Sequence, residues 1–217
     1  METMLYERVQ PKFKAVVRIL IALLASVIGF YPVLYFVSER FGILANKGPA
    51  VLGSMIWNSA FYLHISTGGL ALMIGWVQFN HRLRIAKPGL HRNIGKIYTV
   101  MALVSSLSAG YIAFYAAGGV MATAGFLCLA FAWFTTTFSG YKSIVKRDID
   151  RHRKMMVYSY AACLAAVSLR VLLPLLVYIL NDFVTAYIIV AWACWIPNMI
   201  VAYLIVRNLG EQVQTSS

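Results

Sequence analysis

Acidic residues are scarce in this sequence, and none lies inside an apolar segment. The 217 residues include only seven acids: Glu2, Glu7, Glu39, Asp148, Asp150, Asp182 and Glu211. Without paired carboxylates in a membrane, we expect neither carboxylate-driven proton coupling nor hydrolase chemistry that uses two carboxylates. It also has no glycine-rich phosphate loop, no nucleophile elbow and no HExxH helix, which excludes the hydrolases built on those motifs.

Cysteine is also scarce, and its spacing supports neither disulfides nor a metal site. The three cysteines lie in separate apolar segments, with no CxxC pair: Cys128, Cys163 and Cys194. We interpret them as small buried hydrophobic residues. His81 stands beside an arginine in a polar loop and is expected to be solvated. A zinc site formed by His81, His91 and His152 would have no cysteine or nearby motif to support it.

Apolar side chains dominate the composition. The chain is 61% hydrophobic and 12% charged, with a mean hydropathy of +0.74, so its main solvent should be lipid. Six apolar runs have the length of about 20 residues that a membrane-spanning helix needs, at about 15–37, 58–79, 91–116, 120–140, 155–176 and 183–206. We therefore predict an all-α membrane protein, one six-helix domain over residues 1–217. The first run is too long for a signal-peptide core and should stay as an uncleaved helix.

The positive charges are distributed asymmetrically. If the N-terminus is cytoplasmic, the opposite side carries only Arg40 and Lys47, and Arg170 lies within a span. Almost all other lysines and arginines then fall in the tails and loops of the cytoplasmic side, so the positive-inside rule predicts both termini in the cytoplasm. This bias accounts for the net charge of +12 without a nucleic-acid partner, since no soluble basic face exists.

Glycine, proline and asparagine mark the connections. The outer segment 38–58 is expected to be a loop with a short interfacial helix, and 117–119 (Ala-Gly-Gly) a tight turn. The fifth and sixth helices should meet at 181–182, and 141–154 should form a charged cytoplasmic loop. Pro197 should interrupt the last helix and free a backbone carbonyl one turn earlier.

On each of three helices, the helical periodicity places a histidine and several small residues on one face, and we expect this face to point inward. These faces are His64-Gly68-Ala71-Gly75-Gln78, His91-Gly95-Tyr98-Ala102-Ser105-Ala109 and His152-Met156-Ser159-Cys163-Ala166-Arg170. Small residues let membrane helices approach closely, so these faces should point into the bundle. We take His64, Arg170, Gln78 and Tyr98 as candidate ligand-binding residues.

The depths of these residues predict two polar layers. His64 lies about six residues, or roughly 9 Å, below the outer boundary, and Arg170 lies about 15 residues, or roughly 22 Å, from the inner one. Both should therefore lie in the outer half of the membrane. His91 and His152 should lie at the cytoplasmic ends of their helices.

Arg170 needs a partner, because an arginine at the centre of a span costs about 2.5–3.5 kcal/mol. Glu39, Asp182 or backbone carbonyls could supply one within the chain. An anionic group such as a haem propionate, or a quinone carbonyl, could supply one from a ligand. Alternatively, the side chain extends to the outer interface and has a structural role.

The inner layer could hold one b-type haem. In this hypothesis His91 and His152 are the axial ligands of the haem iron, and Arg92 and Arg153 lie near the propionates. A helix N-terminus favours the neutral imidazole that ligation requires. The alternative is that basic residues at helix ends simply orient the protein, which explains the arginines better than the histidines.

Several strings resemble one family. HISTGGLALMIGWVQFNHRLR, PGLHRNIGKIY, RHRKMMVYSYAACLAAVSLRVLLP and WACWIPN, from about His64 to Asn198, resemble the bacterial membrane proteins of domain of unknown function 2306. The resemblance implies a bacterial plasma-membrane location but no activity. The motif positions in this sequence are His64, Gln78, Arg84, His91, Arg92, Gly95, Tyr98, His152, Met156, Arg170, Pro174 and Asn198. A looser, architectural similarity links the chain to diheme cytochromes of the ascorbate-reducible type, but the histidine of their fourth helix is missing here.

Three hypotheses follow. The first is a membrane redox protein that binds haem b or a quinone on the second, third and fifth helices and meets a quinone or redox partner. The second is a non-redox transporter or small-molecule (anion) binder that uses His64 and Arg170. The third is a structural or assembly subunit in which the polar residues only fix helix packing.

Overall fold

The computed structural model describes the backbone of residues 2–38 and 41–214, and side chains within 15–38 and 41–208. Every regular element in these ranges is helical. Six segments are long and apolar enough to cross a membrane: Ala15–Val37, Met55–Phe79, Pro88–Ala113, Gly119–Val145, Ile149–Leu180 and Phe183–Asn208. The predicted all-α architecture with six spans is confirmed.

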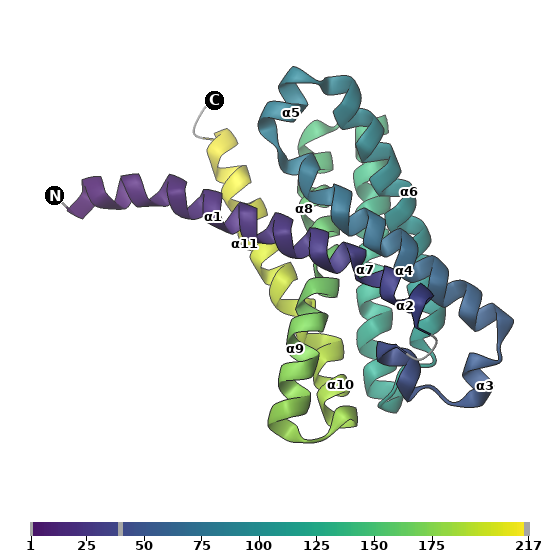
Figure 1. Cartoon of the computed structure of the whole chain (residues 1–217). Coiled ribbons are helices and arrows are strands. Elements are labelled where there is room, and N and C mark those ends of the chain that lie inside the picture. Colours follow the sequence, from purple (N-terminus) through teal and green to yellow (C-terminus); the bar gives the residue numbers. More distant parts are fainter. Residues whose placement is uncertain (1, 39–40, 215–217) are drawn as a thin grey trace.

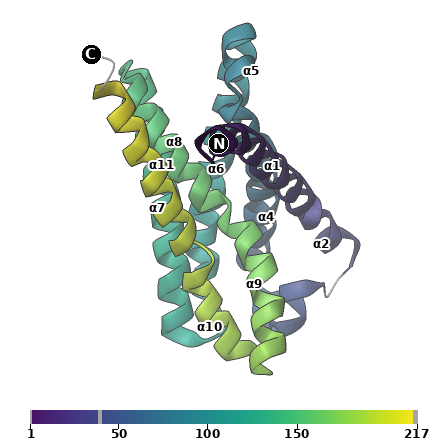
Figure 2. The ribbon, with the colours of Figure 1, turned by 90° about the vertical axis from the view of Figure 1, so that its left-hand side faces the viewer.

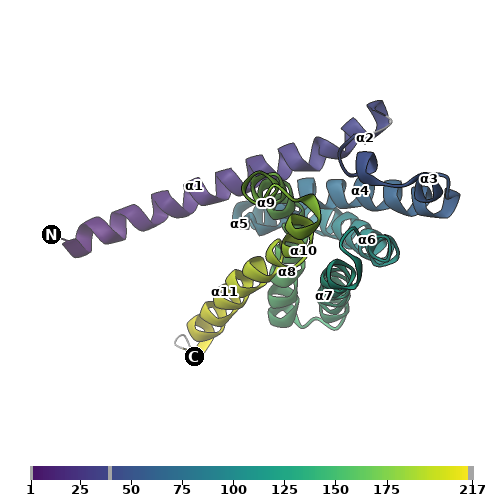
Figure 3. The same cartoon turned by 90° about the horizontal axis from the view of Figure 1, so that it is seen from below.

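The described residues form more helices than spans, because some spans are divided into several helices and short helices lie in the connections. In chain order they are α1 (Glu2–Phe30), η1 (Tyr31–Val33), α2 (Leu34–Val37), η2 (Gly42–Asn46), α3 (Pro49–Leu52), α4 (Met55–Gly75), η3 (Trp76–Phe79), α5 (His81–Ala86), α6 (Pro88–Ala113), α7 (Gly119–Val145), α8 (Ile149–Cys163), α9 (Ala165–Leu180), α10 (Phe183–Ala193) and α11 (Ile196–Gln214). Helices α4, α6, α7, α8–α9 and α10–α11 alternate in direction, whereas α1 crosses them at a steep angle (Figures 1 and 3).

The bundle has two distinct ends, both visible in Figure 1 and from the side in Figure 2. The "α5 end" carries α5, the α7–α8 turn and the last turns of α11. The "α3 end" carries η2, α3, the α6–α7 turn and the α9–α10 turn. The α5 end is the one that the charge pattern predicts to be cytoplasmic.

Several helices begin earlier than the apolar runs indicated. The Ser54 hydroxyl accepts the Trp57 N–H at 3.3 Å and starts α4 at Met55 rather than residue 58. The Asp148 carboxylate accepts the Arg151 N–H at 2.9 Å and starts α8 at Ile149 rather than 155. The predicted loop 141–154 is consequently reduced to the turn at 146–148. Hydropathy misses such starts because polar residues in the first turn are helical but not apolar.

The connections predicted at 38–58, 117–119 and 181–182 are present. Segment 38–58 contains the short helices η2 and α3, and Gly118 and Gly119 adopt φ values of 91° and 62° between α6 and α7. Glycine tolerates such values without steric cost. Asn181, with φ of 50°, ends α9, and Asp182 caps α10 by accepting the N–H groups of Val184 and Thr185, each at 3.1 Å.

The last two spans are each interrupted by a break in the helix, and the two breaks lie next to each other. The break between α10 and α11 precedes Pro197, as predicted, because proline has no N–H to continue the helix. The break at Leu164 between α8 and α9 was not predicted. The side-chain amide of Asn198 donates to the carbonyls of Ala161, at 3.3 Å, and Cys194, at 3.1 Å. A side chain inserted into the backbone ladder is a known cause of a helix break.

Small residues outside the three predicted faces also bring helices close together. A Cβ atom on Gly69 of α4 would lie 2.6 Å from the Gly29 carbonyl oxygen of α1, and one on Gly125 of α7 would lie 2.8 Å from that of Ala191 on α10. Backbones that approach this closely pack well in lipid, where hydrophobic burial gives no driving force.

Large apolar side chains cover the outside of the bundle, as contact with lipid requires. Val27 of α1, Phe131 of α7 and Ile200 of α11 are each more than half exposed. All three cysteines are free. Cys163 and Cys194 are buried, but Cys128 is exposed on α7, so its interpretation as a buried residue is wrong. An apolar environment at Cys128 is supplied by lipid rather than by protein.

Candidate functional site

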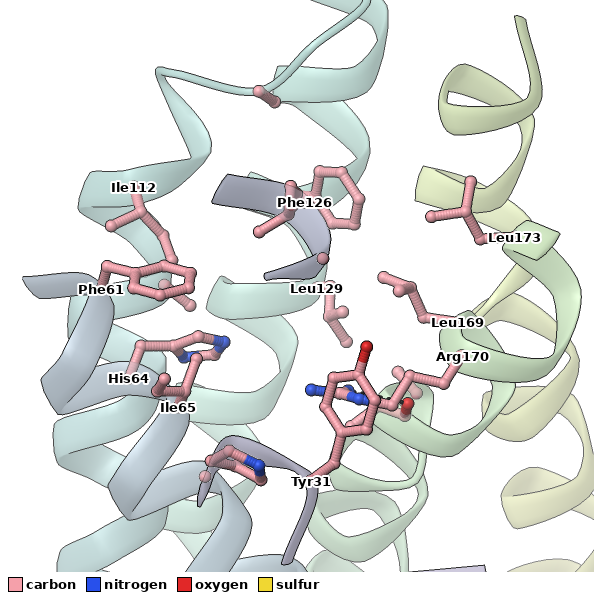
Figure 4. A pocket seen from close by; sticks show the side chains of 18 of the residues that line it. Tyr31, Phe61, His64, Ile65, Ile112, Phe126, Leu129, Leu169, Arg170 and Leu173 are labelled. Atoms are coloured by element: carbon pink, nitrogen blue, oxygen red, sulfur yellow. Dashed lines mark hydrogen bonds between the residues drawn. The ribbon is translucent and has the colours of Figure 1, made fainter. Parts of the chain in front are cut away.

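A cavity of about 610 Å³ lies toward the α3 end, between α1, α4, α6, α7 and α9 (Figure 4). Its volume falls within the range of about 300–1,000 Å³ typical of small-molecule sites. Most of the side chains around it are apolar, including Phe61, Ile65, Ile112, Phe126, Leu129, Leu169 and Leu173. Three residues of the connection between α2 and α4 line it as well: Ile43, Asn46 and Lys47.

His64 and Arg170 both line this cavity. His64 projects from α4 and Arg170 from α9, and Figure 4 shows them on opposite sides with their nitrogen atoms directed toward one another. The helical-rise argument assigns these two residues to one depth, and both line this cavity.

The Arg170 guanidinium is only partly satisfied by the protein. Its Nη1 donates to the Ala166 carbonyl at 3.0 Å, and its central carbon lies 4.7 Å from the ring centroid of Tyr31, a cation–π contact. Its Nε is buried and has no hydrogen-bond partner among the described residues. No described carboxylate forms an ion pair with it: Asp182 caps α10 instead, and Glu39 lies outside the described residues.

The His64 ring is fixed by α6. Its Nδ1 lies 3.0 Å from the carbonyl oxygen of Ser105, and a carbonyl can only accept, so Nδ1 carries the hydrogen. The Ser105 hydroxyl, 2.9 Å from Nδ1, donates its own hydrogen to the His64 carbonyl at 3.0 Å. In the neutral ring Nε2 is then a lone-pair acceptor that faces the cavity (Figure 4).

The absence of a side chain at Gly68 makes this contact possible. A Cβ atom there would lie 2.8 Å from the Ser105 hydroxyl oxygen. The cavity therefore has a cation on one side, a neutral acceptor on the other, and apolar walls between them. Such a site can bind a molecule with one polar head and an apolar body.

His91 and His152 lie in the first turns of α6 and α8, at the α5 end. His152 Nδ1 donates to the Gly140 carbonyl of α7 at 2.9 Å, which leaves its Nε2 free for another partner. His91 lies within electrostatic range of His152, and its Nδ1 is buried without a partner among the described residues. Arg92 and Arg153 are exposed at the same end.

Tyr98 belongs to a polar network between three helices rather than to the cavity. Its hydroxyl lies 2.8 Å from the Ser159 hydroxyl of α8, which lies 2.7 Å from the Thr137 hydroxyl of α7. All three side chains are buried. This network fills the space between α6 and α8 about two helical turns from His91, on the side toward the α3 end.

Gln78 lies near Gly95 of α6, not at the cavity. Its Oε1 lies 3.3 Å from the position that a Cβ atom would take on Gly95, one turn along α6 from His91. His81 is exposed, as expected. Within the described residues, no group of three or more histidine, cysteine, aspartate or glutamate side chains could hold a metal ion.

Sequence reasoning missed two residues of the cavity site. Tyr31 lies at the end of the first apolar run, and nothing in the pattern linked it to Arg170. Ser105 was recognised only as a small residue on the His91 face. The depth argument used for His64 could also have been applied to that face, and it would have marked Ser105 as a possible partner of His64.

The comparisons with known proteins agree with a membrane architecture. The family model described as "Predicted membrane protein (DUF2306)" matches residues 61–206, more than half of the chain. No curated protein and no solved structure matches the chain. The matched range contains His64, Ser105, Arg170 and Asn198, whereas Tyr31 lies outside it.

Proposed function

The chain belongs to the DUF2306 family of predicted membrane proteins, and we propose that it binds a lipid-soluble small molecule in the cavity at the α3 end. The polar head of this ligand would lie between Arg170 and His64, and its body among the apolar side chains. The observation that carries the proposal is the charged guanidinium of Arg170, which lines the cavity with one hydrogen bond and no ion pair to the described part of the protein.

The energy of Arg170 argues for a ligand. An arginine near the centre of a span costs about 2.5–3.5 kcal/mol, and one backbone hydrogen bond and one aromatic face offset only part of that cost. An acceptor from a ligand, either a carboxylate or a quinone carbonyl, would form a charge-assisted hydrogen bond with the guanidinium. The site is therefore better suited to an incoming acceptor than to helix packing alone.

The outer connection provides the end wall of this site. The Lys47 ammonium donates to the Tyr115 carbonyl beyond the end of α6, and the Tyr35 hydroxyl lies 3.5 Å from the Ile43 N–H. Burial lowers the pKa of Lys47 below its usual value. These contacts hold residues 43–47 over the cavity, so a ligand would be enclosed by protein at this end.

The positive-inside rule gives the orientation that we propose. It puts the α5 end and both termini in the cytoplasm of a bacterium, with the protein in the plasma membrane. The cavity then lies in the outer half of the bilayer. A quinone that exchanges electrons with a redox partner and an anion that is carried across both require this binding step.

Ligand binding can be measured with the protein in lipid nanodiscs. We would titrate octanoate and, separately, a short-chain ubiquinone analogue. At least one should bind, and Arg170→Ala should weaken it tenfold or more, because a hydrogen bond to a charged group is worth about 1.5–3 kcal/mol. Arg151→Ala, an exposed arginine of α8, is the matched control and should bind normally. Equal affinities in the two variants would refute the proposal.

A haem at the α5 end is a second candidate function, supported by one observation. The Nδ1 of His152 donates to a backbone carbonyl and leaves Nε2 free, which is the arrangement of most metal-ligating histidines. His91 lies within electrostatic range of this ring, and Arg92 and Arg153 follow the two histidines directly in the sequence. The buried Tyr98 network would confine the group to the α5 end. Haem, when bound, would supply one-electron chemistry.

A further inference from the structure

We propose that the ligand of the cavity is a weak organic acid, a carboxyl group on a hydrocarbon body, and that it binds together with one proton. This inference rests on the proposed function and specifies its ligand. It follows from the unequal chemistry of the two sides of the cavity, Arg170 and His64.

The two sides require different groups of the ligand. Arg170 offers donors and a positive charge, so it needs an acceptor, while the neutral His64 ring offers a lone pair at Nε2 and needs a donor. A carboxylic acid has both a carbonyl oxygen and an O–H group. A quinone has only acceptors and leaves His64 without a partner, and an amine would be repelled by Arg170.

Charge balance leads to the same ligand. In the empty cavity a second positive charge on His64 would face that of Arg170 across apolar surroundings, which is unfavourable. A carboxylate next to Arg170 cancels that repulsion and makes a protonated His64 favourable, with Nε2–H donating to the carboxylate. Whether the proton stays on the ligand oxygen or moves to Nε2, one carboxylate and one proton enter, no covalent bond changes, and the same pair leaves.

No other side chain around the cavity is suited to take this proton. The titratable and charged groups that line it, besides His64, are Tyr31, Tyr35, Lys47, Cys163, Arg170 and Tyr187. From α6 and α7, His64 faces the hydroxyl and carbonyl of Ser105 and non-titrating side chains. Among these types only imidazole normally titrates near neutral pH, and no acid lines the cavity in the described part of the chain.

The proton can be counted directly. Octanoate is titrated calorimetrically into nanodiscs at one pH in two buffers with different ionisation heats, and the difference gives the protons taken up. We expect about one proton per octanoate above pH 7, and an affinity that falls about tenfold per pH unit there. His64→Gln should abolish the uptake and the pH dependence. His81→Gln, an exposed histidine, should retain both.

The outcomes separate this inference from the proposed function. If the wild type binds octanoate with no proton uptake, or binds only the quinone analogue, the acid is the wrong ligand class while the cavity remains a binding site. If the wild type binds neither probe, both proposals fail. Neither reading depends on the folding of a variant, since the wild type alone decides them.

Butyrate shows whether the acid comes from water or from the membrane. It has the same carboxylate but four fewer methylenes, and each buried methylene is worth about fourfold in affinity. The apolar walls therefore predict binding weaker than that of octanoate by a hundredfold or more. Equal affinities would contradict a hydrocarbon body and point to a water-soluble acid.

Discussion

Replacing Arg170 by methionine should make the unliganded protein more stable, although it should also abolish ligand binding. Methionine is flexible enough to fill the same irregular space but carries no charge. The cost of placing an arginine in the span, about 2.5–3.5 kcal/mol, disappears with the substitution. A residue that the protein keeps for a ligand is expected to reduce stability in this way.

The size of the gain follows from the contacts that are lost. The Nη1 hydrogen bond to Ala166 is worth about 0.6 kcal/mol in a membrane protein, and the cation–π contact with Tyr31 about 0.5–2 kcal/mol. Subtracting these from the cost of the arginine leaves a net gain of about 1 kcal/mol. For a chain of this length that is an increase in melting temperature of about 2–4 °C.

Thermal unfolding in one detergent, without ligand, tests this directly. Arg170→Met should melt above the wild type, and Arg151→Met, at an exposed arginine, should melt like it. Octanoate should then stabilise the wild type but not Arg170→Met, because a ligand stabilises only a protein that it binds. An unliganded Arg170→Met that melts several degrees below the wild type would refute the reasoning and show that Arg170 is a structural contact.

Other substitutions test the packing and the second candidate site. Gly69→Ala should destabilise the protein by about 1–3 kcal/mol, because the new Cβ would lie 2.6 Å from a backbone oxygen of α1. Gly110→Ala is the control and should be neutral, because its new Cβ would have no atom within 4 Å. Identical melting temperatures for the two variants would contradict the close approach of α1 and α4. Asn198→Leu should lower the free energy of unfolding by about 1 kcal/mol and speed amide hydrogen exchange at the two helix breaks. Unchanged exchange there would show that the Asn198 side chain does not hold the two breaks together. If haem is bound, protein purified from cells supplied with haem should show a Soret band that His91→Ala and His152→Ala remove, whereas a colourless wild type would eliminate this candidate.

The membrane makes much of the architecture predictable from sequence. A bilayer requires each span to be helical and about 20 residues long, so six apolar runs are enough to predict six spans. The turn at 117–119 and the break before Pro197 follow from local residue chemistry. His64 and Arg170 could be assigned to one depth because the rise of a helix is fixed at 1.5 Å per residue.

Features that depend on a contact between distant segments could not be predicted. No proline or glycine lies within four residues of the break at Leu164. The break involves the side-chain amide of Asn198, 34 residues later in the sequence, which donates a hydrogen bond to the Ala161 carbonyl. Tyr31 reaches Arg170 because α1 crosses the other helices steeply (Figure 3), and no residue pattern within α1 specifies that angle.

Gly68 shows how a packing residue can determine the chemistry of a site. Periodicity identified it only as one of the small residues on a face that points into the bundle. In the structure, that approach brings the Ser105 carbonyl within 3.0 Å of His64 Nδ1, and this carbonyl fixes the hydrogen on Nδ1. With the hydrogen on Nε2 instead, the cavity would present donors on both sides, and an anion could bind without a proton. The glycine thus decides which ring nitrogen carries the hydrogen, and with it whether a proton must enter the site together with the acid.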